Sequence, residues 1–451
     1  MALGLSAEPA DTIWSARYVV TMNPEKRVID FGAVAVRGGR IVGIGPASEI
    51  AKRFQAGERL DRPDGLIAPG LINTHTHAAM SLLRGIADDR PLREWLEKYI
   101  FPAEARYVSP DFVRWGTRLA CLEMLLSGTT TFTDMYYFEE VVAEVTREAG
   151  MRGVLGQTVI GFPVADAKTP QESLARTESF LKRFLGDALV TPAVAPHAVY
   201  TNSDKTLQAA RALADQYDAP LLIHLSETKQ ENDDMRAKRK TTPTQVLESL
   251  GLLTGRTLAA HAVWVDDADL EILKRRGTGI AHCPSSNMKL GSGAAPVVKM
   301  LALDLPVGLG TDGPAGSNND FNLFEEMDLA AKLQKLAALD PRALPATQAM
   351  EMATIRGARA LGMEKTIGSI ENGKAADLIV VRLDRPHAAP LYEAHSQMVY
   401  ALKGSDVRDV MVNGKTLVRD GRALTLNAER ILAKAREYGE KVQASLPENV
   451  R

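Results

Sequence analysis

Cysteine is scarce in this 451-residue sequence, apolar runs are short, and the formal net charge is only -2. The two cysteines, Cys121 and Cys283, provide no disulfide framework and fit a reducing cytoplasm. No apolar run approaches the length of a membrane span, and Met1–Glu8 has neither the basic nor the apolar region of a signal peptide. The small net charge argues against a nucleic-acid partner, which would require a basic surface. We therefore expect a cytoplasmic protein that binds neither membranes nor nucleic acid.

Both ends of the chain are rich in short β-type runs. Residues 11–66 contain several such runs, and Gly38-Gly39 predicts a hairpin turn, because glycine accepts the positive φ that tight turns need. A phosphate-binding loop is the alternative, but no helical pattern follows these glycines. Residues 376–381 and 407–412 also have strand character, Asn413-Gly414 predicts a turn, and residues 426–446 have a helical composition. We predict a small β-sandwich domain built from residues 1–66 and 366–451, with a terminal helix.

Between these ends, short apolar strands alternate with helical stretches such as 111–127, 138–149 and 171–184. This alternation implies a parallel sheet, and the number of units predicts a (β/α)8 TIM-type barrel over residues 67–365. The predicted strands end at Thr74-His75, Thr133-Asp134, Thr158-Val159, Pro196-His197, Ile223-His224, Ala260-His261, Ala281-His282 and Thr311-Asp312. Since chemistry in this fold lies at the C-terminal ends of the strands, the recurrence of His and Asp there predicts a functional site.

The stretch Asn73–His77 predicts a metal site. Residues i and i+2 of a strand share a face, so His75 and His77 aim at one point, and imidazole is a common zinc ligand. An isolated His-x-His pair is often a surface feature, but this chain offers further ligands at other strand ends. A three-nitrogen, one-oxygen set suited to zinc would consist of His75, His77, His224 and Asp312. His261 could be a ligand or lie just behind the ligands. We expect one divalent ion, zinc, with ferrous iron as the alternative.

Five segments carry a resemblance to the amidohydrolase superfamily, and within it to the methylthioadenosine/S-adenosylhomocysteine deaminase family. They are Pro69–His77, Pro91–Leu96, His224–Thr228, His282–Leu290 and Gly310–Gly313. The resemblance spans nearly the whole chain. It implies one metal ion bound by His75, His77, His224 and Asp312. It also implies that Glu227 moves protons between water and the substrate ring, and that His261 orients the attacking hydroxide. The residues that would contact the substrate are Trp95, Glu104 and His197.

The implied reaction is the hydrolytic deamination of an adenine nucleoside: methylthioadenosine, adenosine or S-adenosylhomocysteine. Hydroxide must attack C6, and a bound metal lowers the pKa of water towards neutrality. Asp312 can take the proton of that water while it remains a ligand, and Glu227 can donate a proton to N1, which activates C6. The partner is therefore a small purine nucleoside, and we expect a homo-oligomer.

One position departs from the resemblance. Family members that accept S-adenosylhomocysteine place an arginine near the third strand, where this chain has Gln157. A neutral amide cannot form the bidentate charged pair that arginine gives a carboxylate, and Arg152 lies towards the start of the strand. We expect Gln157 to contact the substrate, and methylthioadenosine to be preferred over S-adenosylhomocysteine.

Other classes of protein fit less well. A chlorohydrolase or guanine-type deaminase of the same branch, acting on a triazine or a free base, remains the alternative enzyme. A non-catalytic scaffold should lack some ligands, and none is missing. The zinc deaminase type with a Pro-Cys-x-x-Cys signature is excluded, because Cys283 has no partner cysteine at that spacing. A two-metal site bridged by a modified lysine is disfavoured, since the predicted fourth strand, residues 189–199, contains no lysine.

Overall fold

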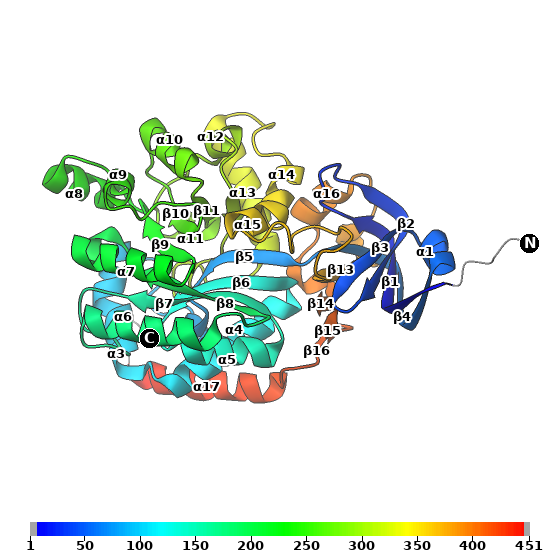
Figure 1. Cartoon of the computed structure of the whole chain (residues 1–451), viewed down its shortest axis with the longest axis horizontal. Helices are drawn as coiled ribbons and strands as arrows, with labels where there is room; N and C mark the ends of the chain where they lie inside the picture. Colours follow the sequence, from blue (N-terminus) through cyan, green and yellow to red (C-terminus); the bar gives the residue numbers. More distant parts are fainter. Residues whose placement is uncertain (1–6, 446–451) are drawn as a thin grey trace, which may run out of the picture.

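The chain forms a closed barrel and, beside it, a sheet to which both ends of the chain contribute (Figure 1). The structure, a computed structural model, describes residues 7–445. Most of the segment for which we predict no signal peptide, residues 1–6, lies outside the described residues. Within the described range, no helix combines the length and apolar character needed to cross a membrane.

Eight strands in parallel pairs close the barrel in the order β10-β11-β12-β5-β6-β7-β8-β9, which confirms the predicted (β/α)8 fold. Their bounds are β5 Leu71–Thr76, β6 Thr129–Tyr136, β7 Arg152–Val159, β8 Val190–Pro196, β9 Leu221–Leu225, β10 Thr257–His261, β11 Gly279–His282 and β12 Val307–Leu309. The last strand is short and meets β5 only at Leu309 and Asn73.

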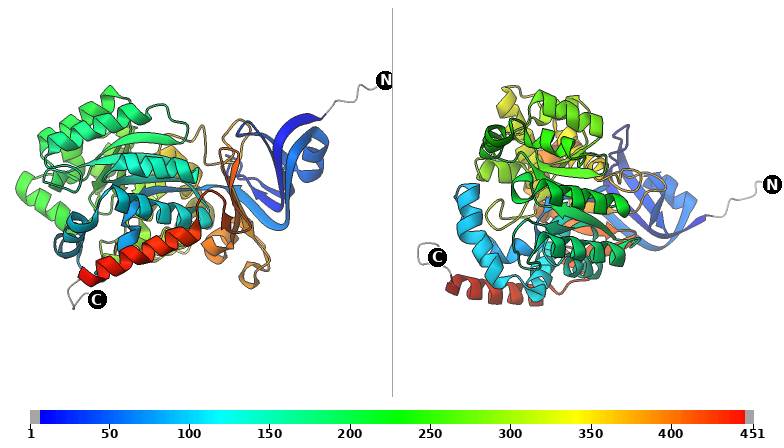
Figure 2. Two further views of the ribbon diagram at one scale, coloured as in Figure 1. Left: turned by 90° about the horizontal axis from the view of Figure 1, so that it is seen from below. Right: turned by 60° about the vertical axis from the view of Figure 1, so that its left-hand side comes forward.

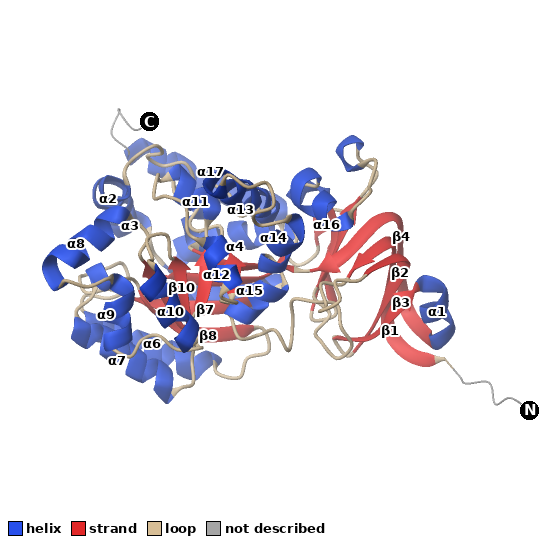
Figure 3. Cartoon of the chain, turned by 90° about the horizontal axis from the view of Figure 1, so that it is seen from above, coloured by secondary structure: helices blue, strands red, loops and turns tan. Residues whose placement is uncertain are grey.

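Helices surround the barrel strands in Figure 3. The three helices predicted from the sequence are present within one residue of the expected bounds. Several begin with a serine or threonine whose side chain accepts a hydrogen bond from the first turn, as Ser109 and Thr169 do. The helices from the barrel region are α2 Leu92–Trp95, α3 Phe101–Tyr107, α4 Pro110–Leu126, α5 Glu139–Ala149, α6 Pro170–Phe184, α7 Asp204–Gln216, α8 Lys229–Arg239, α9 Pro243–Ser249, α10 Asp267–Arg276, α11 Pro284–Lys289, α12 Val297–Ala302, α13 Leu323–Ala338, α14 Ala346–Met352 and α15 Ile355–Ala360.

The second sheet has the strand order β16-β15-β14-β13-β4-β1-β2-β3. Its strands are β1 Glu8–Val20, β2 Val28–Arg37, β3 Arg40–Pro46, β4 Phe54–Pro69, β13 Leu378–Arg382, β14 Val407–Val412, β15 Lys415–Arg419 and β16 Arg422–Ala423. Helix α1, Ala47–Arg53, packs on β2 and β3, and the short helix α16, Ala394–Ser396, packs on α14. Buried residues from both halves of this order, such as Val34 and Met411, share one core, so the sheet folds over on itself. The two predicted turns meet there, because a side chain at Gly39 would collide with Asn413.

The apolar run before the histidines is divided between the two sheets. β4 runs to Pro69 and pairs with β13, and β5 begins two residues later at Leu71. Gly70 makes the change of direction, where any side chain would collide with Thr130. The predicted boundary after residue 66 therefore falls inside a strand, and the division of the chain into domains stays a prediction.

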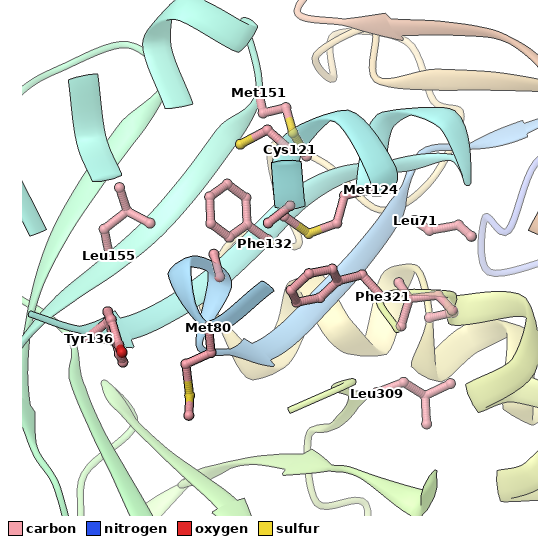
Figure 4. Packing of buried hydrophobic residues seen from close by; sticks show 14 of the residues in the cluster. Leu71, Met80, Cys121, Met124, Phe132, Tyr136, Met151, Leu155, Leu309 and Phe321 are labelled. Carbon is pink, nitrogen blue, oxygen red and sulfur yellow. The ribbon is translucent and has the colours of Figure 1, made fainter. Parts of the chain in front are cut away.

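The predicted C-terminal helix is α17, Ala428–Ser445, which lies along the barrel as the red helix of Figure 2. It packs on α4, where the Tyr438 hydroxyl donates a 2.6 Å hydrogen bond to Asp111. Behind α4 lies the core of Figure 4, in which Cys121 packs with Phe132 and Met151. Cys121 and Cys283 are both buried and unpaired.

Candidate active site

Five predicted side chains meet at the C-terminal edge of the barrel. His75 lies on β5 and His77 directly follows that strand. His224 lies on β9, His261 ends β10, and Asp312 lies in the loop after β12. Nε2 of His75 and Nε2 of His77 lie 3.4 and 3.3 Å from Oδ1 of Asp312. Nε2 of His224 lies 3.4 Å from Nε2 of His77. The nitrogen and oxygen atoms of the cluster fall into two groups, His75–His224–His261 and His75–His77–Asp312, each within 4.8 Å.

Backbone carbonyls fix two of the imidazoles with Nε2 facing the centre of this cluster. Nδ1 of His77 donates to the Met135 carbonyl, and Nδ1 of His224 donates to the His197 carbonyl, both at 2.8 Å. A carbonyl oxygen can only accept, so each Nδ1 carries the proton and each Nε2 keeps its lone pair. Nε2 of His75 is buried without a hydrogen-bond partner. Lone pairs that face one another in this way fit a bound cation.

The spacing also fits a tetrahedral ion. Ligand atoms about 2.1 Å from zinc in tetrahedral geometry lie about 3.4 Å from one another. Three separations, those of Asp312 from His75 and His77 and that of His77 from His224, are 3.3–3.4 Å and match that edge length. The donor set of imidazole nitrogens and one carboxylate oxygen is the type that zinc prefers.

Closure of the barrel places Asp312 beside the histidines. The side chain of Asn73 on β5 donates to Thr311 Oγ1 at 2.8 Å, and the Asp312 amide donates to the His75 carbonyl at 2.9 Å. Asp312 has a positive φ of 65°, and so does His261 at 72°. Such conformations cost non-glycine residues energy and concentrate at functional sites. Burial raises the pKa of Asp312, but the facing imidazoles of His75 and His77 outweigh it and hold that pKa well below its usual range.

Glu227 and His261 lie beside the cluster. Oε2 of Glu227 is 3.9 Å from Nε2 of His261, which is itself 4.0 Å from Oδ2 of Asp312. The Glu227 amide donates to Glu231 at 2.8 Å, which fixes the loop after β9. Burial raises the pKa of Glu227, against the opposing effect of His261. A carboxyl with a raised pKa, close to the cluster, is suited to carry a proton.

These groups form one end of a cavity with an empty volume of about 630 Å³, including the part open to solvent. Trp95, Glu104 and His197, which are predicted to contact the substrate, line the cavity. The remaining lining residues are His77, Met80, Leu92, Leu96, Ile100, Phe101, Met135, Tyr136, Tyr137, Thr158, Ile160, Tyr200, His224, Glu227, His261, Leu290, Asp312 and Ser317.

Glu104 is the third buried acid of the cavity, besides Glu227 and Asp312. It accepts hydrogen bonds from the hydroxyls of Tyr136 at 2.6 Å and Tyr137 at 3.4 Å. Burial raises the pKa of Glu104 to about 7, although both tyrosines oppose the shift. The two tyrosines were not predicted from the sequence. Their place directly after Thr133-Asp134, at a predicted strand end, was the available signal.

Gln157 does not line the cavity, which corrects the prediction that it contacts the substrate. Its side-chain amide donates to Asp166 at 2.8 Å, and its oxygen accepts from the Glu139 amide at 3.2 Å. Successive strand residues face opposite sides, and Thr158, the next residue, lines the cavity instead. Gln157 therefore belongs to the layer between β7 and the helices. Arg152 also lies away from the cavity, where it pairs with Asp377 at 3.2 Å.

A closed eight-stranded barrel with histidines, an aspartate and a buried glutamate at its C-terminal edge defines a (β/α)8 hydrolase with a candidate metal centre. Comparison with known protein families agrees with this class of enzyme. Residues 66–417 match the Amidohydrolase family, and residues 32–54 match the Imidazolonepropionase-like composite domain of bacteria. The chain belongs to the amidohydrolase family.

Individual relatives are similar along almost their whole length. A 5-methylthioadenosine/S-adenosylhomocysteine deaminase of Thermodesulfovibrio yellowstonii is 45% identical over 95% of this chain and 98% of its own. The 5-methylthioadenosine/S-adenosylhomocysteine deaminase 1 of Syntrophus aciditrophicus is 47% identical over 98% of this chain and 100% of its own. The crystal structure of an adenosine deaminase from Xanthomonas campestris with bound zinc superimposes with a TM-score of 0.95, at 39% identity, over 97% of this chain and 100% of that one.

Proposed function

We propose that this protein is a metal-dependent hydrolytic deaminase of adenine nucleosides, which converts the 6-amino group to a 6-oxo group and releases ammonia. The observation that carries the proposal is the meeting of three imidazoles, Asp312 and Glu227 at one end of a cavity. The similarity to deaminases of adenine nucleosides over nearly the full chain supports it.

One divalent ion, zinc or alternatively ferrous iron, would be held by His75, His77, His224 and Asp312. When bound, such an ion lowers the pKa of water to near neutrality. The unpartnered Nε2 of His75 and the separations of 3.3–3.4 Å support this ligand set. His261 stands behind the ligands, because its Nε2 lies 4.0 Å from Asp312, farther than the two ligand histidines.

Asp312, Glu227 and His261 would move or orient the protons of the reaction. Asp312 Oδ1 faces the ligand histidines, whereas Oδ2, which accepts a hydrogen bond from Ser286, faces His261 and would accept the proton of the attacking water. Glu227 donates its proton to N1 of the purine, which makes C6 more electrophilic, and His261 accepts a hydrogen bond from the attacking oxygen and orients it. The proton taken up by Asp312 then passes to the 6-amino group, the C6–N bond breaks to release ammonia, and the C6 hydroxyl returns a proton to Glu227. The pKa of Glu227, raised by burial, favours a protonated carboxyl that can donate.

The rest of the cavity binds the nucleoside. Glu104, on the wall with Tyr136 and Tyr137, offers acceptors to the hydroxyls of the sugar, and Trp95 and His197 cover the ring. Trp95 is held in place because its indole nitrogen donates to the Ala315 carbonyl at 3.0 Å. This brings the segment after β5 over the loop that follows Asp312.

Methylthioadenosine is the proposed preferred substrate. Among the described residues, the cavity lining includes no arginine or lysine, whereas leucine, isoleucine and phenylalanine are prominent in it. Nearby Lys289 is engaged, since its ammonium bonds to Asp88 and to the Gly316 carbonyl at 2.7 Å. An apolar methylthio end costs little to bury there, but the charged end of S-adenosylhomocysteine would lack a partner. Because Gln157 lies outside the cavity, Gln157→Arg is not expected to supply one.

The test is ammonia release by the metal-loaded protein from methylthioadenosine, S-adenosylhomocysteine, adenosine, guanine and a chlorotriazine, with His75→Ala as the inactive control. Release from the adenine nucleosides alone supports the proposal. Release only from guanine, or chloride release from the triazine, would establish the alternative enzyme class, and a fully inert, metal-loaded protein would establish a scaffold.

Three further features belong to the proposal. The catalytic barrel comprises residues 67–365, and residues 1–66 and 366–451 form the accessory β domain. The protein is a cytoplasmic homo-oligomer. Its two buried, unpaired cysteines are consistent with a reducing compartment.

A further inference from the structure

The segment His282–Asn287 has no role in the proposed mechanism. β11 ends at His282, and α11 begins at Pro284 and turns back towards the site. Ser286 and Asn287, in the middle of this short helix, are 1% and 0% exposed. Neither lines the cavity, yet each side chain bonds to a residue that does.

Asn287 determines which nitrogen of His261 carries the proton. The Asn287 side-chain oxygen lies 3.1 Å from Nδ1 of His261, and an amide oxygen can only accept. Nδ1 therefore donates, and Nε2 keeps a lone pair. That lone pair lies 3.9 Å from Glu227 and 4.0 Å from Asp312, separations that suit one bridging water oxygen.

Ser286 fixes the carboxylate of Asp312. Its hydroxyl donates to Oδ2 at 2.7 Å, while the Gly313 amide donates to Oδ1 at 2.7 Å. These two donors set the rotation of the carboxylate, so Oδ1 faces the ligand histidines and Oδ2 faces His261. Without Ser286 the carboxylate could turn about its bond to the chain.

The short helix is itself tied to the loop that carries Asp312. The Ser285 amide donates to Glu326 at 3.1 Å, and Glu326 accepts from the Asn318 side chain at 2.9 Å. The same Asn318 amide donates to the Thr311 carbonyl at 2.8 Å. This chain of bonds holds the supports of His261 and Asp312 at a fixed separation.

We propose that Ser286 and Asn287 are positioning residues of the site: Asn287 holds His261 in the tautomer whose Nε2 accepts a hydrogen bond, and Ser286 holds Asp312 in the rotamer that binds metal through Oδ1. Together they aim two acceptors at the same water. The inference rests on the proposed function only in taking this water as the one that attacks the substrate.

The test compares four variants of the full chain. Asn287→Leu removes the acceptor at similar size, and Asn287→Asp keeps an acceptor. Ser286→Ala removes the donor to Asp312. Ser285→Ala is the matched control, because the bond from the Ser285 backbone amide to Glu326 survives this change while the Ser286 side chain is left intact.

Two measurements require no substrate. The chain has eight histidines, whose ring nitrogens can be observed in a ¹⁵N-histidine spectrum. In the unmodified protein the proton of His261 should be on Nδ1. In Asn287→Leu a larger fraction of His261 should carry its proton on Nε2. Zinc affinity should fall roughly 10-fold or more in Ser286→Ala, the usual effect of removing a group that orients a metal ligand. It should be unchanged in Ser285→Ala.

With methylthioadenosine, Asn287→Leu should lower kcat at least tenfold with little change in KM, and Asn287→Asp should recover much of the loss. An Nε2-protonated His261 in the unmodified protein, or equal zinc affinity in Ser286→Ala and Ser285→Ala, would overturn the inference. Failure of methylthioadenosine to react would instead count against the proposed function, because the tautomer and the zinc affinity are read without it. If Asn287→Leu does not fold, the inference is still tested by the tautomer of His261 in the unmodified protein and by the zinc affinities of Ser286→Ala and Ser285→Ala.

Discussion

Replacing Glu227 with glutamine should remove most of the turnover and leave the fold and the metal in place. Glu227 is 5% exposed, lines the cavity, and places Oε2 3.9 Å from His261. Glutamine has the same size, and Glu227 is outside the proposed ligand set. A glutamine amide, however, cannot donate a proton to N1 or accept one from the C6 hydroxyl, so only the chemical step should suffer.

The magnitude follows from the position of the acid. A well-placed general acid–base group contributes about 10²- to 10⁴-fold in rate, or about 3 to 5 kcal/mol of activation free energy. Burial raises the pKa of Glu227, so the carboxyl holds its proton at higher pH than an exposed glutamate. This favours the donor form, and we expect a fall in kcat of roughly 10² or more.

The assay is ammonia release from methylthioadenosine at saturating concentration, with bound metal measured in the same preparation. Glu351→Gln is the control, because Glu351 is a buried acid on α14 that pairs with Lys26 at 2.7 Å and does not line the cavity. It should keep normal turnover. Near-normal kcat in a metal-replete Glu227→Gln protein would refute the assignment of Glu227 as the proton carrier.

Three further predictions concern the metal, the substrate and stability. Elemental analysis should find about one divalent ion per chain, and His75→Ala should lose both metal and activity; two tightly bound equivalents would contradict the mononuclear site. The value of kcat/KM should be higher for methylthioadenosine than for S-adenosylhomocysteine, and the reverse order would show that a cation outside the lining reaches the charged tail. Burial raises the pKa of Glu326 from 4.5 to about 8, so the folded state holds a proton that the unfolded chain releases between these values. This contribution to stability is complete below about pH 4.5 and is lost as the pH rises through about 8. Denaturant unfolding at pH 5 and pH 9 should therefore differ less in Glu326→Gln than in the unmodified protein, and equal differences would exclude Glu326 as the cause.

The barrel was predictable because its signals are local. Strand–helix alternation is written in apolar periodicity, and the carboxyl ends of parallel strands meet at one edge however far apart they are in sequence. His75 and Asp312, 237 positions apart, could therefore be assigned to one site from residue order and type alone. The turns at Gly38-Gly39 and Asn413-Gly414 could also be predicted, because few residues other than glycine adopt a positive φ readily.

Only the tertiary structure decided which side chains face the cavity and which side chains hold the site residues in place. Gln157 and Thr158 are neighbours on one strand, and a register difference of one residue decides which faces the cavity. Asn287 and Ser286 gain their partners from other strands and loops, so no local pattern reveals their contacts. The sequence alone determined which elements form and which chemistry gathers at their ends, since these depend on periodicity and residue type. The folded chain alone determined which side chains line the cavity and which hold others in place, because packing between distant elements sets those distances.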